Sequence, residues 1–358
     1  MKINKKEDKS GAAAEYARYK RRKARIGLYL AIALFAAAVA AVYIGSVQVT
    51  IGQIIDALMH HGDKMREIII WNIRIPRVFA AVIAGMSLAL AGCVMQCVLR
   101  NPLASPFTMG VSQAAGFGAA LAIIFFGAGS AHSAGLPAVL NNPYTVVIFA
   151  FLGSLVGIFM ILLLARFARL TPQSMVLAGI AMGTLFSAAT MLLQYFAVDV
   201  KVASVIFWTF GDMGRAGRTD VLVMLLITIP AVIYFMRNRW EYNVLESGEE
   251  TAKALGVNTE RLRLVGVLFA SLITSVSVAF LGIIGFVGLI APHMMRRVVG
   301  ADHRYLIPIT AVFGGLLLLG ADTLSRMILS PVVLPVGILT SFMGVPLFMY
   351  LILQKRKL

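Results

Sequence analysis

Charged residues are scarce in this chain, and cysteine is almost absent. Asp, Glu, Lys and Arg make up 13% of the 358 residues, whereas soluble domains carry roughly 25%. This shortage excludes a disordered chain and argues against a soluble enzyme. With only two cysteines, the chain cannot be held together by a disulfide scaffold.

The sequence also lacks the motifs of several catalytic classes. It has no G-x-x-x-x-G-K-[ST] phosphate loop and no H-E-x-x-H metal motif. The five histidines are scattered, and no Cys/His cluster has zinc spacing. His60 and His61 are adjacent but have no cysteine or second pair near them. We therefore expect no catalytic residues, no bound metal and no cofactor, and we interpret the chain as a conduit rather than an enzyme.

What the sequence does contain is long apolar runs. Hydrophobic residues make up 59% of the chain and the mean hydropathy is +0.87. A membrane-spanning helix needs about 20 apolar residues, which predicts an all-α membrane protein with about ten transmembrane helices. The predicted spans are 26–44, 78–99, 112–127, 144–165, 175–197, 220–236, 264–284, 286–299, 305–325 and 336–354.

The basic residues predict the orientation of these spans. The formal net charge is +16, and ten Lys or Arg lie in residues 1–25. If the N-terminus is cytoplasmic, most of the remaining basic residues also fall in cytoplasmic segments, as such loops require. This explains the net charge without nucleic acid. We predict a basic cytoplasmic segment 1–25, a transmembrane domain 26–355 in the cytoplasmic (inner) membrane, and both termini inside.

The longest predicted cytoplasmic loop spans 237–263. Within it, Ser247 to Gly256 is typical of a short helix, with Ser247 as the cap and Gly256 as the stop. Such a helix between two spans suits the docking of a soluble partner. The alternative is a solvated connector.

Three features inside or beside the spans allow a functional and a structural interpretation. Asp322 is the only acid well inside a predicted span, which makes it a functional candidate. Pairing with backbone amides, with hydroxyls or with an arginine such as Arg326, one turn away, is favoured over proton coupling. Cys93 and Cys97 share one helix face, where packing is favoured over binding of a soft metal.

Two prolines in 101–106 interrupt the helix, either as a pathway constriction or as a plain turn.

Several motifs, taken in order and spacing, resemble one known family. They are Arg74-Ile75-Pro76-Arg77, Arg100-Asn101-Pro102-Leu103-Ala104, Ala254-Leu255-Gly256-Val257, Gly285-Phe286-Val287-Gly288-Leu289-Ile290-Ala291-Pro292-His293, Asp302-His303-Arg304 and Pro335-Val336-Gly337-Ile338-Leu339-Thr340. Over residues 45–355 the chain resembles the FecCD family, the permease subunits of ATP-binding-cassette (ABC) importers for iron-siderophore complexes, haem and vitamin B12.

The resemblance implies a type II ABC importer permease fold and a homodimer or a pair with a close paralogue. It implies cytoplasmic ATPase subunits, which use ATP and Mg, and an extracytoplasmic substrate-binding protein. The expected cargo is an iron-siderophore complex, with haem or vitamin B12 as the alternative. An ion-coupled secondary transporter is the rival class.

The resemblance also assigns roles to individual positions. The expected contacts to the binding protein are Arg74, Arg77 and Arg326, on an exposed outer surface. The expected pathway and gate residues are Asn101, Leu103, Thr171 and Ser174. The expected coupling residues toward the ATPase are Glu249, Ala252, Leu255 and Gly256.

Overall fold

The computed structural model describes residues 5–45, 49–128, 143–168, 171–330 and 332–354. Every regular element in these ranges is a helix. Ten of them coincide with the ten predicted spans: α1 (Lys5–Tyr43), α4 (Ile75–Val98), α5 (Val111–Phe126), α6 (Pro143–Phe167), α7 (Pro172–Tyr195), α9 (Arg218–Arg237), α12 (Thr259–Leu281), α13 (Val287–Val299), α14 (His303–Met327) and α15 (Val336–Gln354). The predicted all-α membrane fold is confirmed.

The lengths of these helices differ. Seven are long and apolar enough to cross a membrane, namely α1, α4 with the segment before it, α6, α7, α9, α12 and α14. The helices α5, α13 and α15 are shorter, and α13 has 13 residues. The boundary predicted at residue 25 falls inside α1, which runs unbroken from Lys5 to Tyr43.

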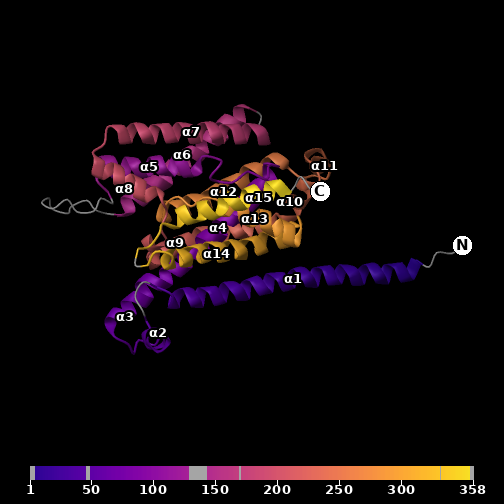
Figure 1. Ribbon diagram of the computed structural model, residues 1–358. Coiled ribbons are helices and arrows are strands. Elements are labelled where there is room, and N and C mark those ends of the chain that lie inside the picture. Colours follow the sequence, from indigo (N-terminus) through magenta and orange to yellow (C-terminus); the bar gives the residue numbers. More distant parts are fainter. Residues whose placement is uncertain (1–4, 46–48, 129–142, 169–170, 331, 355–358) are drawn as a thin grey trace.

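Short helices connect the spans. Before α4 lie α2 (Ile51–Leu58), α3 (Lys64–Ile68) and the π-helix η1 (Ile69–Arg74). Between α7 and α9 lie α8 (Asp199–Thr209) and η2 (Met213–Arg215), and between α9 and α12 lie α10 (Arg239–Glu246) and α11 (Glu249–Ala254). Figure 1 shows α10, α11 and both termini at one end of the bundle, which we call the α11 end. The opposite end, with α2, α3 and α8, is the α2 end.

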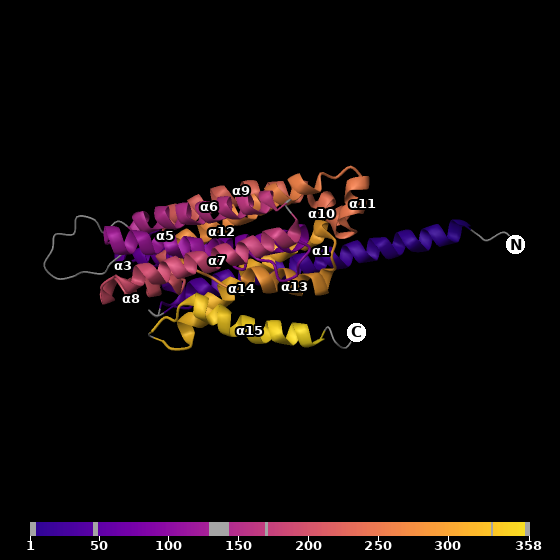
Figure 2. The ribbon, with the colours of Figure 1, turned by 90° about the horizontal axis from the view of Figure 1, so that it is seen from above.

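The helix α4 forms the centre of the bundle. It packs against α14, α12, α13 and α9, and nearly all of its residues are buried. Seen from above, α15 lies at one edge (Figure 2), and α1 lies along α14 at another (Figure 1).

Glycines allow the helices around α4 to approach closely. A Cβ on Gly92 would lie 1.7 Å from the carbonyl oxygen of Gly288 on α13, and one on Gly85 would lie 2.3 Å from that of Gly314 on α14. Small residues at such contacts permit close van der Waals packing of helix backbones. This side of α4 is therefore a packing surface, and Cys93 and Cys97 are buried beside it.

The break between α12 and α13 also follows the prediction. The chain leaves α12 at Gly282, with φ +83°, and Phe286 takes φ +65° directly before α13. A non-glycine residue at positive φ is uncommon, and here it interrupts the helical backbone within a continuous apolar run.

Candidate functional site

At the α2 end, a buried cluster of charges joins three helices. Asp322 on α14 is fully buried and accepts hydrogen bonds from Arg77 of α4, with Nε 3.0 Å and Nη2 2.8 Å from Oδ1. Arg326, one turn further along α14, places its Nε 3.3 Å from Oδ2 of the same carboxylate. The predicted pairing of Asp322 with Arg326 is confirmed, and Arg77 is a second, closer partner.

Two arginines of this cluster hold the end of α1. Arg74 donates to the carbonyl oxygens of Val42 and Tyr43 at 2.6 and 2.9 Å, and Arg326 donates to that of Ile44 at 2.6 Å. The last carbonyls of a helix have no partner within the helix, and positive charge is favourable there. The cluster thus fastens α1 to α4 and α14.

This geometry changes the interpretation of the three arginines. Arg74 and Arg326 are 5% and 7% exposed, and the side chain of Arg77 is 12% exposed. The expectation that they lie on an exposed surface is wrong, because an acid and backbone carbonyls of the same chain already occupy their guanidinium groups. Their role in docking stays a prediction. It now requires that they act by shaping the docking surface from inside the bundle and not by touching the partner protein.

At the α11 end, the predicted gate segments meet in a cleft. A cavity of about 590 Å³ is lined by Leu99, Arg100 and Asn101 after α4, by the first turns of α7 and by Glu249 of α11. Asn101 turns this segment by accepting the backbone N–H of Leu103 at 2.9 Å, and Leu103 is 47% exposed. Residues far apart in the sequence therefore share one opening.

The predicted residues Thr171 and Ser174 lie beside this cleft and have a local structural role. The Thr171 hydroxyl caps α7 by accepting the backbone N–H of Ser174 at 3.1 Å. Such a cap satisfies a helix N–H that otherwise has no partner. The neighbouring Pro172 and Gln173, rather than the two hydroxyl residues, line the cleft.

The predicted helix in the loop 237–263 is present as α11. Its cap is Gly248 and not Ser247, and it ends before Gly256, which takes φ +84°. Ser247 was wrong as the cap because it lies at the end of α10, where its N–H bonds to Val244. The stop at Gly256 is confirmed.

The two sides of α11 differ. Glu249 pairs with the buried Arg263 of α12 at 2.9 Å and with Lys253 at 3.3 Å, and Ala252 is fully buried. Burial raises the pKa of Glu249, but the charges of Arg263 and Lys253 outweigh it and leave the pKa below its ordinary value. Leu255, in contrast, is 67% exposed beside Gly256. One side of α11 thus anchors it to the bundle, and the other presents a leucine.

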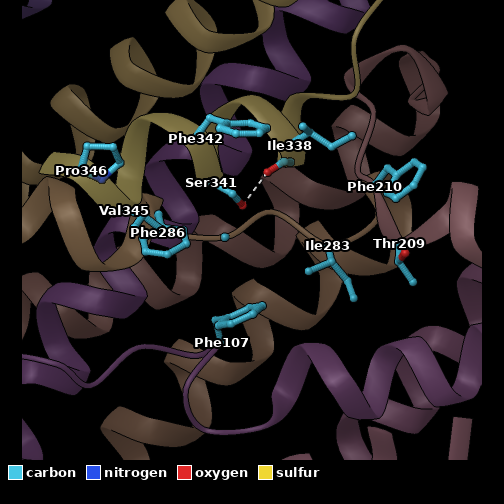
Figure 3. Close-up of a pocket in the computed structure, with 12 residues that line it drawn as sticks. Phe107, Thr209, Phe210, Ile283, Phe286, Ile338, Ser341, Phe342, Val345 and Pro346 are labelled. Carbon is cyan, nitrogen blue, oxygen red and sulfur yellow. Dashed lines mark hydrogen bonds between the residues drawn. The ribbon is translucent and has the colours of Figure 1, made fainter. Parts of the chain in front are cut away.

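A second cavity, which the sequence did not reveal, lies between α15 and the α12–α13 connection. It measures about 570 Å³, and Phe107, Phe210, Phe286 and Phe342 line it. Figure 3 shows Phe107, Phe286 and Phe342 around this space, each from a different segment of the chain. The Ser341 hydroxyl donates to the Gly337 carbonyl at 2.8 Å, so the wall is almost wholly apolar. Such a wall can pass a ligand without binding it tightly.

Comparison with known proteins agrees with this architecture. The model of the FecCD transport family matches residues 31–354. A protein of Methanocaldococcus jannaschii named as an ABC transporter permease is 58% identical, over 96% of this chain and 98% of its own length. A hemin transport system permease of Yersinia pestis is 38% identical, over 80% of this chain and 84% of its own length.

One solved structure shows the same fold. A metal-chelate type ABC transporter in an inward-facing conformation superposes with a TM-score of 0.80 and 31% identity, covering 92% of this chain and 99% of that one. The family model and the solved structure thus each cover nearly the whole sequence. The chain belongs to the FecCD transport family and is a multi-pass membrane permease subunit of an ABC importer, not an enzyme.

Proposed function

We propose that this permease translocates an iron-siderophore complex across the cytoplasmic membrane, driven by a separate ATPase subunit. The same machine carrying haem or vitamin B12 is the alternative, and the similarity to a hemin permease supports it. The architecture is compatible with either cargo, because the only hydroxyl side chains in the lining of the apolar cavity, Thr209 and Ser341, donate to backbone carbonyls of their own helices.

The observation that carries the proposal is the connection from α11 to the cleft. Buried Arg263 binds Glu249 of α11 and also donates to the carbonyl oxygen of Val98, the last residue of α4, at 3.1 Å. Asn101, in the lining of the cleft, follows three residues later. A displacement of α11 therefore acts directly on the segment that lines the opening.

Leu255 is the contact through which an ATPase would displace α11. It is exposed, it projects at the end of the helix, and Gly256 leaves space beside it. Ala252 and Glu249 face the bundle instead, so they transmit the movement rather than touch the partner. ATP and Mg are used by that ATPase and not by this chain.

The α2 end is the proposed docking surface for an extracytoplasmic substrate-binding protein. Arg74 and Arg326 support this surface from within, because they hold the end of α1 in place. Arg77 is joined to Arg326 through Asp322. The α11 end, with both termini, then faces the cytoplasm. A second permease copy or a close paralogue completes the pathway beside α7 and α15, whose apolar side chains, Leu177, Leu192 and Phe342 among them, are exposed in the single chain.

The rival class, an ion-coupled secondary transporter, has less support. A proton-coupling carboxylate in a membrane must be able to change its charge. Asp322 is instead already engaged in ion pairs with two guanidinium groups of the same chain, those of Arg77 and Arg326.

Reconstitution tests the proposal. The chain is placed in vesicles with its ATPase and binding protein, and uptake of a ferric siderophore, haem and cobalamin is measured in parallel. We expect uptake of one cargo that requires ATP and is lost on Leu255→Asp. Uptake that continues without the ATPase and follows a proton or sodium gradient would show that the chain is a secondary transporter.

A further inference from the structure

Three side chains from distant parts of the sequence converge at the α11 end. They are Cys97 in the last turn of α4, Glu246 at the end of α10 and His303 at the start of α14. The sulfur, a carboxylate oxygen and a ring nitrogen all lie within 4.8 Å of one another. The histidine Nε2 is 4.0 Å from Glu246 Oε1. This set has the donor atoms of a transition-metal site.

The hydrogen bonds of His303 leave Nε2 free to bind a metal. The Asn243 side-chain oxygen accepts the backbone N–H of His303 at 2.7 Å and lies 3.0 Å from Nδ1, while the Asn243 amide group donates to Asp302. Since that oxygen only accepts, Nδ1 carries the proton and Nε2 carries the lone pair. Metal-binding histidines are oriented in the same way, through a hydrogen bond from the other ring nitrogen.

The lone pair on Nε2 accepts no hydrogen bond from the described residues. His303 is fully buried, and its Nε2 has no hydrogen-bond partner among the described residues. Leaving a buried polar atom unpaired is unfavourable. Cys97, also buried, directs its S–H toward the Tyr242 carbonyl oxygen at 3.6 Å, which leaves sulfur lone pairs for a ligand.

We propose that Cys97, Glu246 and His303 bind a borderline transition-metal cation such as Zn²⁺. Thiolate, imidazole and carboxylate are all zinc ligands, and tetrahedral bond lengths place them about 3.3–3.8 Å apart. The three donor atoms now lie within 4.8 Å of one another, and small side-chain rotations are enough to bring them to these separations. Because Glu246 is exposed, water can complete the fourth position, as in zinc sites with three protein ligands.

Arg296 is the charged group that opposes the cation. Its Nη2 lies 3.4 Å from Glu246 Oε1. The same Oε1 lies 4.0 Å from His303 Nε2, so Glu246 must turn its other oxygen toward the metal to keep this contact. The arginine lowers the affinity without filling the site.

The ion would restrain the coupling segment. Glu246 ends α10, and α11 begins three residues later at Glu249. A metal that joins α10 to α4 and α14 would hinder the movement of α11, so excess metal should slow transport. This consequence, unlike the binding itself, rests on the proposed function.

The first test is binding of Co²⁺ to the purified full-length protein in detergent. A tetrahedral thiolate site gives a near-ultraviolet sulfur-to-cobalt charge-transfer band, and Zn²⁺ should displace it. We expect the band in the unmodified protein and in Cys93→Ser, the matched control one turn away, and its loss in Cys97→Ser. His303→Asn keeps the contact to Asn243 but removes Nε2, so it should also abolish the band.

Two further variants keep the test decisive if a ligand variant folds poorly. Asn243→Ala removes the group that orients the histidine and should weaken binding about 10- to 100-fold. Arg296→Gln should strengthen binding, which misfolding cannot imitate. Absence of the band in folded unmodified protein, or its persistence in Cys97→Ser, would overturn the proposal.

The second test separates regulation from transport. In reconstituted vesicles, Zn²⁺ should slow ATP-driven uptake by the unmodified protein and by Cys93→Ser but not by Cys97→Ser. Equal inhibition of all three would overturn the regulatory role. If no ATP-driven uptake occurs at all, the proposed function fails while the Co²⁺ result still decides the metal site.

Discussion

The Asp322→Asn substitution tests the buried charge cluster most directly. Asp322 is fully buried and neutralises Arg77 and Arg326. Asparagine has nearly the same shape but no charge. It would leave Arg326 without its ion-pair partner and Arg77 with only the exposed Asp212, and Arg326 also holds the end of α1. We therefore expect α1 to detach locally from the bundle.

The magnitude follows from the burial of the pair. Removing one partner of a buried ion pair costs about 3–5 kcal/mol, which is a roughly 100- to 4,000-fold change in an equilibrium. Solvent does not reduce this value much, since the Arg77 side chain is 12% exposed and that of Asp322 is 0% exposed.

Hydrogen–deuterium exchange at the end of α1 measures this change. In Asp322→Asn, the amides of Val42 to Ile44 should exchange at least about 100-fold faster when reclosing is faster than chemical exchange, because the exchange rate then follows the opening equilibrium. The matched control is Asp212→Asn, because Asp212 lies 3.4 Å from the same Arg77 but is 42% exposed. An exposed pair is worth at most about 1 kcal/mol, so its effect should stay below about fivefold. Equal effects of the two substitutions would refute the reasoning.

Three other predictions follow from individual contacts. Gly92→Ala should lower the melting temperature, because the added methyl group would overlap the backbone carbonyl of Gly288. The control Gly320→Ala should not, since no atom lies within 4 Å of the added methyl group. Equal melting temperatures of the two variants would show that α4 and α13 can separate freely. Leu255→Asp should abolish co-purification of the ATPase, and the same change at Leu58, exposed at the α2 end, should leave it intact. Burial raises the pKa of Asp302, but hydrogen bonds from Arg304 and Asn243 outweigh this and lower it to about 2 from 3.8. The ionised Asp302 should therefore stabilise the fold fully above about pH 4, and this stabilisation should disappear as the pH falls toward 2. In a series of thermal melts at different pH, Asp302→Asn should remove that part of the pH dependence of the melting temperature.

The membrane spans could be predicted because each is encoded locally. The predicted 78–99 and 305–325 correspond to α4 and α14 within a few residues. The lipid interior demands a continuous apolar helix, so composition over about 20 residues is sufficient. The break before α13 was predictable for a similar reason, since glycines at 282 and 285 interrupt the run.

The side-chain environment of the candidate sites was not predictable in the same way. Arg74, Arg77 and Arg326 were correctly grouped, but their burial depends on where α1 ends and on an acid 245 residues from Arg77. The exposed Leu255 and the buried Ala252 differ because only one side of α11 rests on the bundle. The four phenylalanines of the apolar cavity come from separate segments and have no shared pattern in the sequence.

The sequence by itself determined the class of this protein, the ten predicted spans that appear as helices in the described residues, their order and its family. It did so because hydropathy and short motifs are properties of contiguous residues. The tertiary structure alone decided which charges neutralise one another and that Cys97, Glu246 and His303 meet. These are contacts between residues far apart in the chain, and close helix packing at Gly85 and Gly92 brings α13 and α14 against α4. No local pattern encodes such distances.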